Sequence, residues 1–165
     1  MEITRELHDN VGSHKALVFS QFLGMLQLIR ERLDKLQINY AYLDGQTASE
    51  DRKATVERFQ TDPECKVFLI SLKAGGVGLN LTAADYVYIV DPWWNPAVEQ
   101  QAIDRTHRIG QTRSIFAYKM ICKNTIEEKI LQLQEKKRVF AKEIVSDDSA
   151  FLKNLTKDDI DYLFS

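Results

Sequence analysis

The chain has 165 residues, of which 44% are hydrophobic and 28% charged, and its formal net charge is −2. This length and composition predict one soluble globular domain, and the absence of a run of about 18 apolar residues excludes a membrane-spanning helix. The net charge argues against nucleic-acid binding over the whole surface, but residues 101–145, with ten basic and five acidic side chains, allow a local basic patch.

Cysteine and histidine usage points to an intracellular protein without a metal site. Cys65 and Cys122 are far apart in the sequence and have no neighbouring Cys or His pattern, so we expect reduced thiols. The three histidines are scattered and lack the spacing of metal ligands.

Short apolar runs rich in β-branched and aromatic residues predict five strands, at residues 15–20, 38–43, 66–71, 86–90 and 114–121. Helical spacing and capping signals predict helices over 22–36, from the capping box Thr47–Glu50, over 95–110 and from the capping box at Thr125 to about residue 145. We expect the last 20 residues to dock as short helices.

Strands that alternate with helices predict an α/β fold with a parallel sheet and helices on both faces. In such folds function gathers at the carboxyl ends of the strands. Gln21, Thr47 and Lys73 are polar residues close to predicted strand ends. They are therefore candidates for a common site, although each alone is more often solvated than functional.

The predicted helix over 95–110 places Gln101, Arg105 and Arg108 on one stripe, beside an apolar face. Two guanidinium groups at this spacing suit a polyphosphate, because each offers a planar fork of donors. The alternative is a solvated helix face, on which Asp104 and Arg108 form a weak ion pair.

Residues 73–80 form a glycine-rich stretch, which we expect to be a loop that either brings backbone N–H groups close to an anion or serves as a tight connector. It is not a phosphate-binding loop of the Walker type, because the chain has no Gly-Lys-Ser/Thr sequence. In the following loop, Trp93 suits core packing, whereas Trp94 is the better candidate to stack on a base or enter a groove.

Five ordered motifs together resemble the second, C-terminal motor lobe of the SWI/SNF family of helicase-like ATPases. They lie at residues 15–22, 43–45, 74–81, 91–96 and 101–111. The resemblance implies a RecA-like lobe over residues 1–124, with a sheet sandwiched between helices in three layers. It also implies a long bracing helix over 125–145, followed by an acidic extension over 146–165 that is either a docked strut or an autoinhibitory element. The Pro-Trp-Trp-Asn-Pro variant is more similar to the bacterial branch.

The resemblance also implies roles for individual residues. Arg105 and Arg108 would act as arginine fingers on ATP, supported by Gln101. The other expected roles are coupling of nucleotide to DNA (Gly76, Gly78 and Asn80), contact with the DNA backbone (Gln21, Thr47 and Lys73) and insertion into the groove (Trp94).

The expected partners are duplex DNA and an N-terminal RecA-like lobe of the same polypeptide, which would carry the Walker lysine and the Mg²⁺ ligands. We therefore expect the isolated chain to hydrolyse ATP negligibly. The expected location is the cytoplasm or nucleoid of a bacterium, or the nucleus of a eukaryote. The alternatives are the second lobe of an RNA helicase and a non-catalytic module that binds nucleic acid or a protein partner.

Overall fold

A computed structural model of the chain describes residues 2–9, 12, 14–75, 79–91, 96–104, 114–138 and 155–164. Within these ranges, five parallel strands form one sheet in the order β2-β3-β1-β4-β5. The strands are β1 (Ala16–Ser20), β2 (Tyr40–Leu43), β3 (Val67–Ser71), β4 (Tyr86–Ile89) and β5 (Phe116–Lys119). The helices are α1 (Glu2–Asp9), α2 (Leu23–Lys35), α3 (Ser49–Thr61), α4 (Leu72–Gly75), α5 (Pro96–Asp104), α6 (Ile126–Arg138) and α8 (Lys157–Phe164).

All five predicted strands are confirmed, and their ends lie within two residues of the predicted ends. β1 and β3 are buried along their whole length, because helices cover both faces of the sheet there and almost every side chain is apolar. In the centre of the sheet, Val18 of β1 pairs in register with Leu69 of β3 and Tyr88 of β4. β5 lies at the edge of the sheet, and its side chains are exposed.

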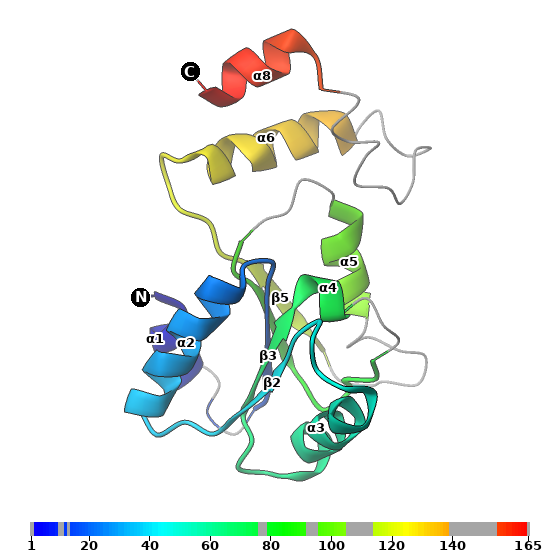
Figure 1. Ribbon diagram of the computed structural model, residues 1–165. Helices are drawn as coiled ribbons and strands as arrows, with labels where there is room; N and C mark the ends of the chain where they lie inside the picture. Colours follow the sequence, from blue (N-terminus) through cyan, green and yellow to red (C-terminus); the bar gives the residue numbers. More distant parts are fainter. Residues whose placement is uncertain are drawn as a thin grey trace.

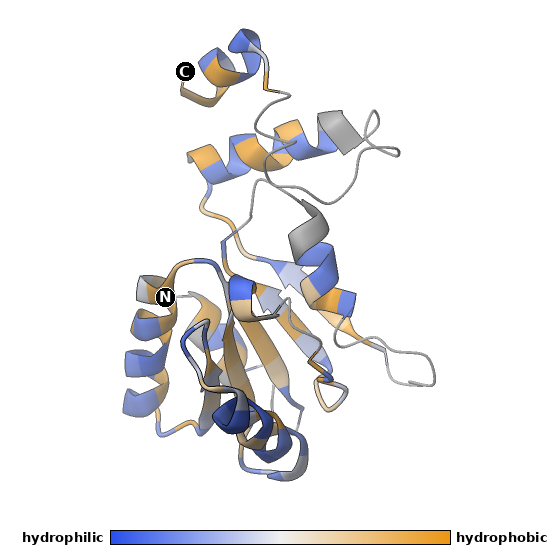
Figure 2. Cartoon of the chain, turned by 45° about the vertical axis from the view of Figure 1, so that its right-hand side comes forward, coloured by the Kyte–Doolittle hydropathy of each residue, from blue (hydrophilic) through white to orange (hydrophobic). Residues whose placement is uncertain are grey.

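Helices lie on both faces of the sheet, so the predicted three-layer, RecA-like α/β fold is confirmed (Figure 1). One core cluster lies under α1 and α2 and includes Ile3, Leu7, Val18, Leu26, Ile29, Leu33, Leu69 and Tyr88. A second cluster lies under α3 and α5 and includes Leu17, Phe59, Phe68, Ile70, Val87 and Ala102. Figure 2 shows the corresponding pattern, with hydrophobic strands inside and hydrophilic outer faces on the flanking helices.

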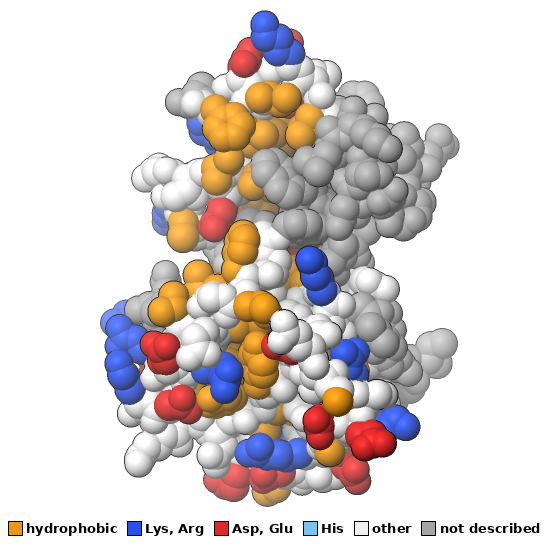
Figure 3. All heavy atoms as spheres, in the orientation of Figure 1, with side chains coloured by type: hydrophobic (Ala, Val, Ile, Leu, Met, Phe, Trp, Pro, Cys, Tyr) orange, Lys and Arg blue, Asp and Glu red, His pale blue; other side chains and the backbone are white. Residues whose placement is uncertain are grey.

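Beyond β5, α6 and α8 form a separate helical pair. The predicted helix start at Thr125 is confirmed, since Thr125 Oγ1 accepts the N–H of Glu127 at 3.3 Å. The reciprocal bond differs from that of a capping box, because Glu128 Oε2 accepts the N–H of Asn124 at 2.9 Å. α8 packs on α6 through a small cluster that contains Ile130, Leu133 and Leu163. Hydrophobic side chains also gather on the visible face of this pair (Figure 3). α8 confirms that the tail contains a docked helix, whereas the proposed domain boundaries stay predictions.

Two local predictions are wrong. Thr47 does not cap α3, because its hydroxyl is bonded to Asp44 instead; the helix begins at Ser49, and Ala48 stands at the cap position without a side-chain bond. The glycine-rich stretch is not a loop throughout, since residues 72–75 form the one-turn helix α4. The buried Ser71 accounts for this turn, because its Oγ accepts the N–H of Ala74 at 3.3 Å.

Candidate functional site

The carboxyl ends of four strands lie side by side, and polar residues follow each of them. Across the sheet, the turn with Thr47 follows β2, Lys73 of α4 follows β3, Gln21 follows β1 and Asp91 follows β4. Because the strands are parallel, all four groups meet at one edge of the sheet. The structure therefore places Gln21, Thr47 and Lys73 together, as the sequence predicted, while their roles stay predictions.

Asp44 organises the turn after β2. Its Oδ1 accepts the N–H of Gln46 at 2.9 Å, and both the N–H and the hydroxyl of Thr47 at 3.1 Å. Its Oδ2 accepts the hydroxyl of Tyr42 at 2.9 Å. Burial alone would raise the pKa of Asp44, but the hydrogen bonds from Gln46, Tyr42 and Thr47 outweigh it and lower this pKa below its ordinary value. Asp44 is thus ionised near neutral pH and fixes the position of Thr47.

Asp91 holds the loop after β1. This carboxyl is only 3% exposed, and its Oδ2 accepts the backbone N–H of Gln21 at 3.0 Å. Burial raises the pKa of Asp91, against the opposing effect of hydrogen bonds from Ser20 and Gln21. The side chain of Gln21 is half-buried. Asp91 therefore links the end of β4, which leads toward α5, to the loop that carries Gln21.

We expect Asp91→Asn to change how the stability of the chain depends on pH. The raised pKa means that the folded state binds the Asp91 proton more tightly than the unfolded state does. Its stabilising contribution is therefore complete below the unfolded pKa and is lost as the pH rises through the folded pKa. The free energy of unfolding of the wild type should fall, relative to the Asn variant, as the pH rises from about 4 to about 7. Urea unfolding of both proteins checks this, and a difference that stays constant over this range would contradict it.

Lys73 and Asn80 flank the part of the glycine-rich stretch that lies outside the described residues. Lys73 is exposed on α4, and Asn80 is exposed on the other side. The backbone of the second flank is held by α3, because Gln60 Nε2 donates to the carbonyl of Asn80 at 2.9 Å and Gln60 Oε1 accepts the N–H of Ala83 at 2.8 Å. The two flanks are thus tied to the fold on either side of Gly76 and Gly78.

α5 has the orientation that the sequence predicted. Ala102 is buried in the core below α3 and α5, whereas Gln101 is exposed. A feature that sequence reasoning missed is Glu99, which is 1% exposed and forms an ion pair with Lys119 of β5. This pair ties α5 to the edge of the sheet. The helix that presents Gln101 is therefore anchored by an apolar contact and by an ion pair.

Several predicted site residues lie outside the described residues, so the structure leaves their placement untested. They are Gly76, Gly78, Trp93, Trp94, Arg105 and Arg108. The alternative, an ion pair between Asp104 and Arg108, is also untested, because Arg108 lies outside the described residues. Asp104 accepts a hydrogen bond from Gln100 Nε2 at 2.9 Å.

Two buried carboxylates, Asp91 and Glu99, were not assigned a role from the sequence. A signal exists for each: Asp91 directly follows an apolar strand, and Glu99 is three residues before the buried Ala102 on the same helix. Within the described ranges, no group of three or more His, Cys, Asp or Glu side chains could hold a metal ion. In the same ranges no helix has the length and apolar character needed to cross a membrane.

The chain matches the helicase conserved C-terminal domain family over residues 1–110. It is 48% identical over 151 residues to the ATP-dependent helicase rhp16 of Schizosaccharomyces pombe, which covers 92% of this chain and 18% of that protein. The solved C-terminal part of the Fun30 ATPase domain superposes with a TM-score of 0.80 at 34% identity, over 98% of this chain and 51% of that chain. The SWI2/SNF2 ATPase core domain of Sulfolobus solfataricus gives a TM-score of 0.78 at 36% identity, over 99% of this chain and 33% of that chain.

The match to the family model covers most of the chain, while the chain spans less than a fifth of the fission-yeast relative. The predicted bacterial branch stays a prediction. The family model and the two solved structures agree with one another, and the chain therefore belongs to the helicase conserved C-terminal domain family, as the second RecA-like lobe of a SWI2/SNF2-type ATPase.

Proposed function

We propose that the chain is half of a DNA-dependent ATPase motor that translocates on duplex DNA and remodels protein–DNA complexes. The observation that carries the proposal is the placement of Thr47, Lys73 and Gln21 after three adjacent strands, at one edge of the sheet. A hydroxyl, an ammonium and an amide in a row suit the successive phosphates of a nucleic-acid backbone. In this proposal Trp94 enters the groove of the duplex.

The nucleotide side of the proposed motor is α5 and the residues that follow it. ATP fits this chain in part: Gln101 is exposed on an anchored helix and Arg105 and Arg108 follow, but the chain has no Walker lysine. When bound, ATP supplies the γ-phosphoryl group that the arginines stabilise. We assign the phosphate cradle and the Mg²⁺ ligands to an N-terminal lobe of the same polypeptide.

The proposal has consequences for the chain as a whole. In this proposal Gly76, Gly78 and Asn80 couple the DNA side to the nucleotide side. Without the first lobe the 165-residue chain should hydrolyse ATP negligibly. A motor of this kind acts where DNA is, in the nucleoid or in the nucleus.

Lys73→Ala in the full-length protein tests the DNA contact. Loss of one phosphate contact should weaken binding of duplex DNA about equally for different sequences, and should reduce the slope of log affinity against log salt by about one. The matched control is Lys35→Ala, which removes an exposed ammonium from the end of α2, near the amino ends of the strands. Binding of labelled duplex at several salt concentrations measures both quantities. Equal slopes for the two variants would mean that Lys73 does not contact the DNA backbone.

A further inference from the structure

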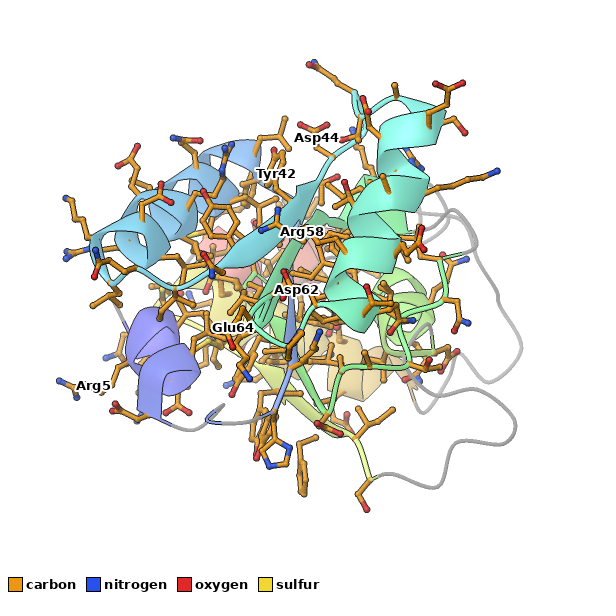
Figure 4. All side chains as sticks on the ribbon, turned by 90° about the horizontal axis from the view of Figure 1, so that it is seen from below. Arg5, Tyr42, Asp44, Arg58, Asp62 and Glu64 are labelled. Atoms are coloured by element: carbon orange, nitrogen blue, oxygen red, sulfur yellow. The ribbon has the colours of Figure 1, made fainter. Side chains whose placement is uncertain are left out.

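We infer that Tyr42 is a positioning residue for the Thr47 turn, and that it acts through Asp44 without touching DNA itself. The inference rests on the proposed function and deepens it, because it names what prepares one of the proposed phosphate contacts. Figure 4 shows Tyr42 and Asp44 side by side at β2, between α2 and α3. Neither side chain has a role among the functional residues that the sequence predicts.

Tyr42 and Asp44 are in direct contact. Tyr42 donates its hydroxyl to Asp44 Oδ2 at 2.9 Å, and Asp44 Oδ1 holds the turn through Gln46 and Thr47. The two oxygens of the Asp44 carboxylate thus have different roles. Oδ2 is held by Tyr42 of β2, and Oδ1 holds the turn that follows β2.

Tyr42 is itself held by its surroundings. Its ring is half-buried, and the guanidinium of Arg30 on α2 lies 4.5 Å from the ring centroid. Burial raises the pKa of the Tyr42 hydroxyl, and its hydrogen bond to Asp44 raises it further, so the phenol keeps the proton that it donates. The contact with Arg30 and the partial burial of the ring favour this orientation of Tyr42, in which its hydroxyl is directed at Asp44.

Asp44 in turn connects Tyr42 to the proposed phosphate contact at Thr47. The N–H of Asp44 donates to Thr47 Oγ1 at 3.1 Å, so the hydroxyl oxygen stays anchored when its proton turns from Asp44 to a phosphate. Asp44 keeps its bonds to the N–H groups of Gln46 and Thr47 meanwhile. The turn is thus ordered before DNA arrives, which removes part of the entropic cost of binding.

Tyr40 provides a matched control on the same strand. Its hydroxyl accepts Arg30 Nε at 3.4 Å and lies two residues before Tyr42, so both side chains are on the same face of β2. Tyr40→Phe and Tyr42→Phe are the same chemical change. They differ in that the Tyr42 hydroxyl bonds Asp44, whereas the Tyr40 hydroxyl bonds Arg30.

The experiment measures ATP turnover by the full-length protein as a function of duplex DNA concentration. Tyr42→Phe should raise the DNA concentration for half-maximal stimulation about two- to tenfold and leave turnover without DNA unchanged, since one hydrogen bond is lost. Tyr40→Phe should leave both values unchanged. Because Tyr42 acts through Thr47, Tyr42→Phe should add little in a Thr47→Val background. Asp44→Asn should reproduce the effect by a second route, should Tyr42→Phe fold poorly.

The outcomes separate the inference from the function on which it rests. If Thr47→Val weakens DNA stimulation while Tyr42→Phe does not, or if the two effects simply add, Tyr42 has no positioning role and the motor proposal stands. If Tyr40→Phe has the same effect as Tyr42→Phe, general support of β2 explains both. If duplex DNA fails to stimulate the wild type, the proposed function and this inference fall together.

Discussion

Arg108→Ala in the full-length protein should lower ATP turnover at saturating ATP and DNA by about 10³- to 10⁵-fold. An arginine finger stabilises the charge that develops on the transferred phosphoryl group, so its loss raises the barrier of the chemical step. Binding of ATP should change far less than turnover does. Steady-state phosphate release gives the turnover, and titration with a labelled nucleotide gives the affinity.

Arg58→Ala is the matched control for Arg108→Ala. Arg58 is exposed near the end of α3 and has a long contact of 3.9 Å with Asp62, of the kind that contributes about 0–1 kcal/mol. Since α3 starts after β2 and ends before β3, Arg58 lies near the amino ends of the strands, away from the site. Turnover by Arg58→Ala should match the wild type. Near-normal turnover by Arg108→Ala would favour the alternative, in which the arginines lie on a solvated helix face.

Leu33→Ala should lower the free energy of unfolding of the chain by about 2–5 kcal/mol. Leu33 is fully buried where α2 packs on the sheet, so truncation loses transfer free energy and leaves a cavity in the core. Urea unfolding followed by circular dichroism measures the change. The expected loss is a large fraction of the stability of a typical domain.

Leu28→Ala makes the same truncation on the same helix, at a side chain that is 52% exposed. It should change the free energy of unfolding by less than about 0.5 kcal/mol, as surface substitutions usually do. Equal losses for the two variants would mean that α2 does not pack on the sheet through the face that contains Leu26, Ile29 and Leu33.

The fold was predictable because local patterns and global packing agree. The runs at 16–20 and 67–71 are apolar on both faces, which suits strands covered on both sides, and the spacing over 23–35 suits one buried helical face. The order of the strands across the sheet was not predictable from these patterns, since apolar runs do not specify which strands pair. α1 was not predicted either, because its buried residues, Ile3 and Leu7, are too few to give a clear helical period.

The sequence predicts at which edge of the sheet the candidate site lies, but it does not predict the contacts that hold the site together. Thr47 satisfied the pattern of a helix cap, but Asp44, three residues earlier, competes for its hydroxyl. Asp91 and Glu99 are buried although carboxylates are usually exposed. Each is stabilised by a partner far away in the sequence, the N–H of Gln21 and the ammonium of Lys119. Contacts of this kind depend on the tertiary fold.

The most direct test of the motor proposal is ATP turnover by the full-length protein with duplex DNA or with structured RNA. We predict that duplex DNA stimulates turnover strongly and that structured RNA does not. Stimulation by RNA alone would indicate the second lobe of an RNA helicase. If neither nucleic acid changes turnover, the proposal that DNA binds along Thr47, Lys73 and Gln21 is contradicted.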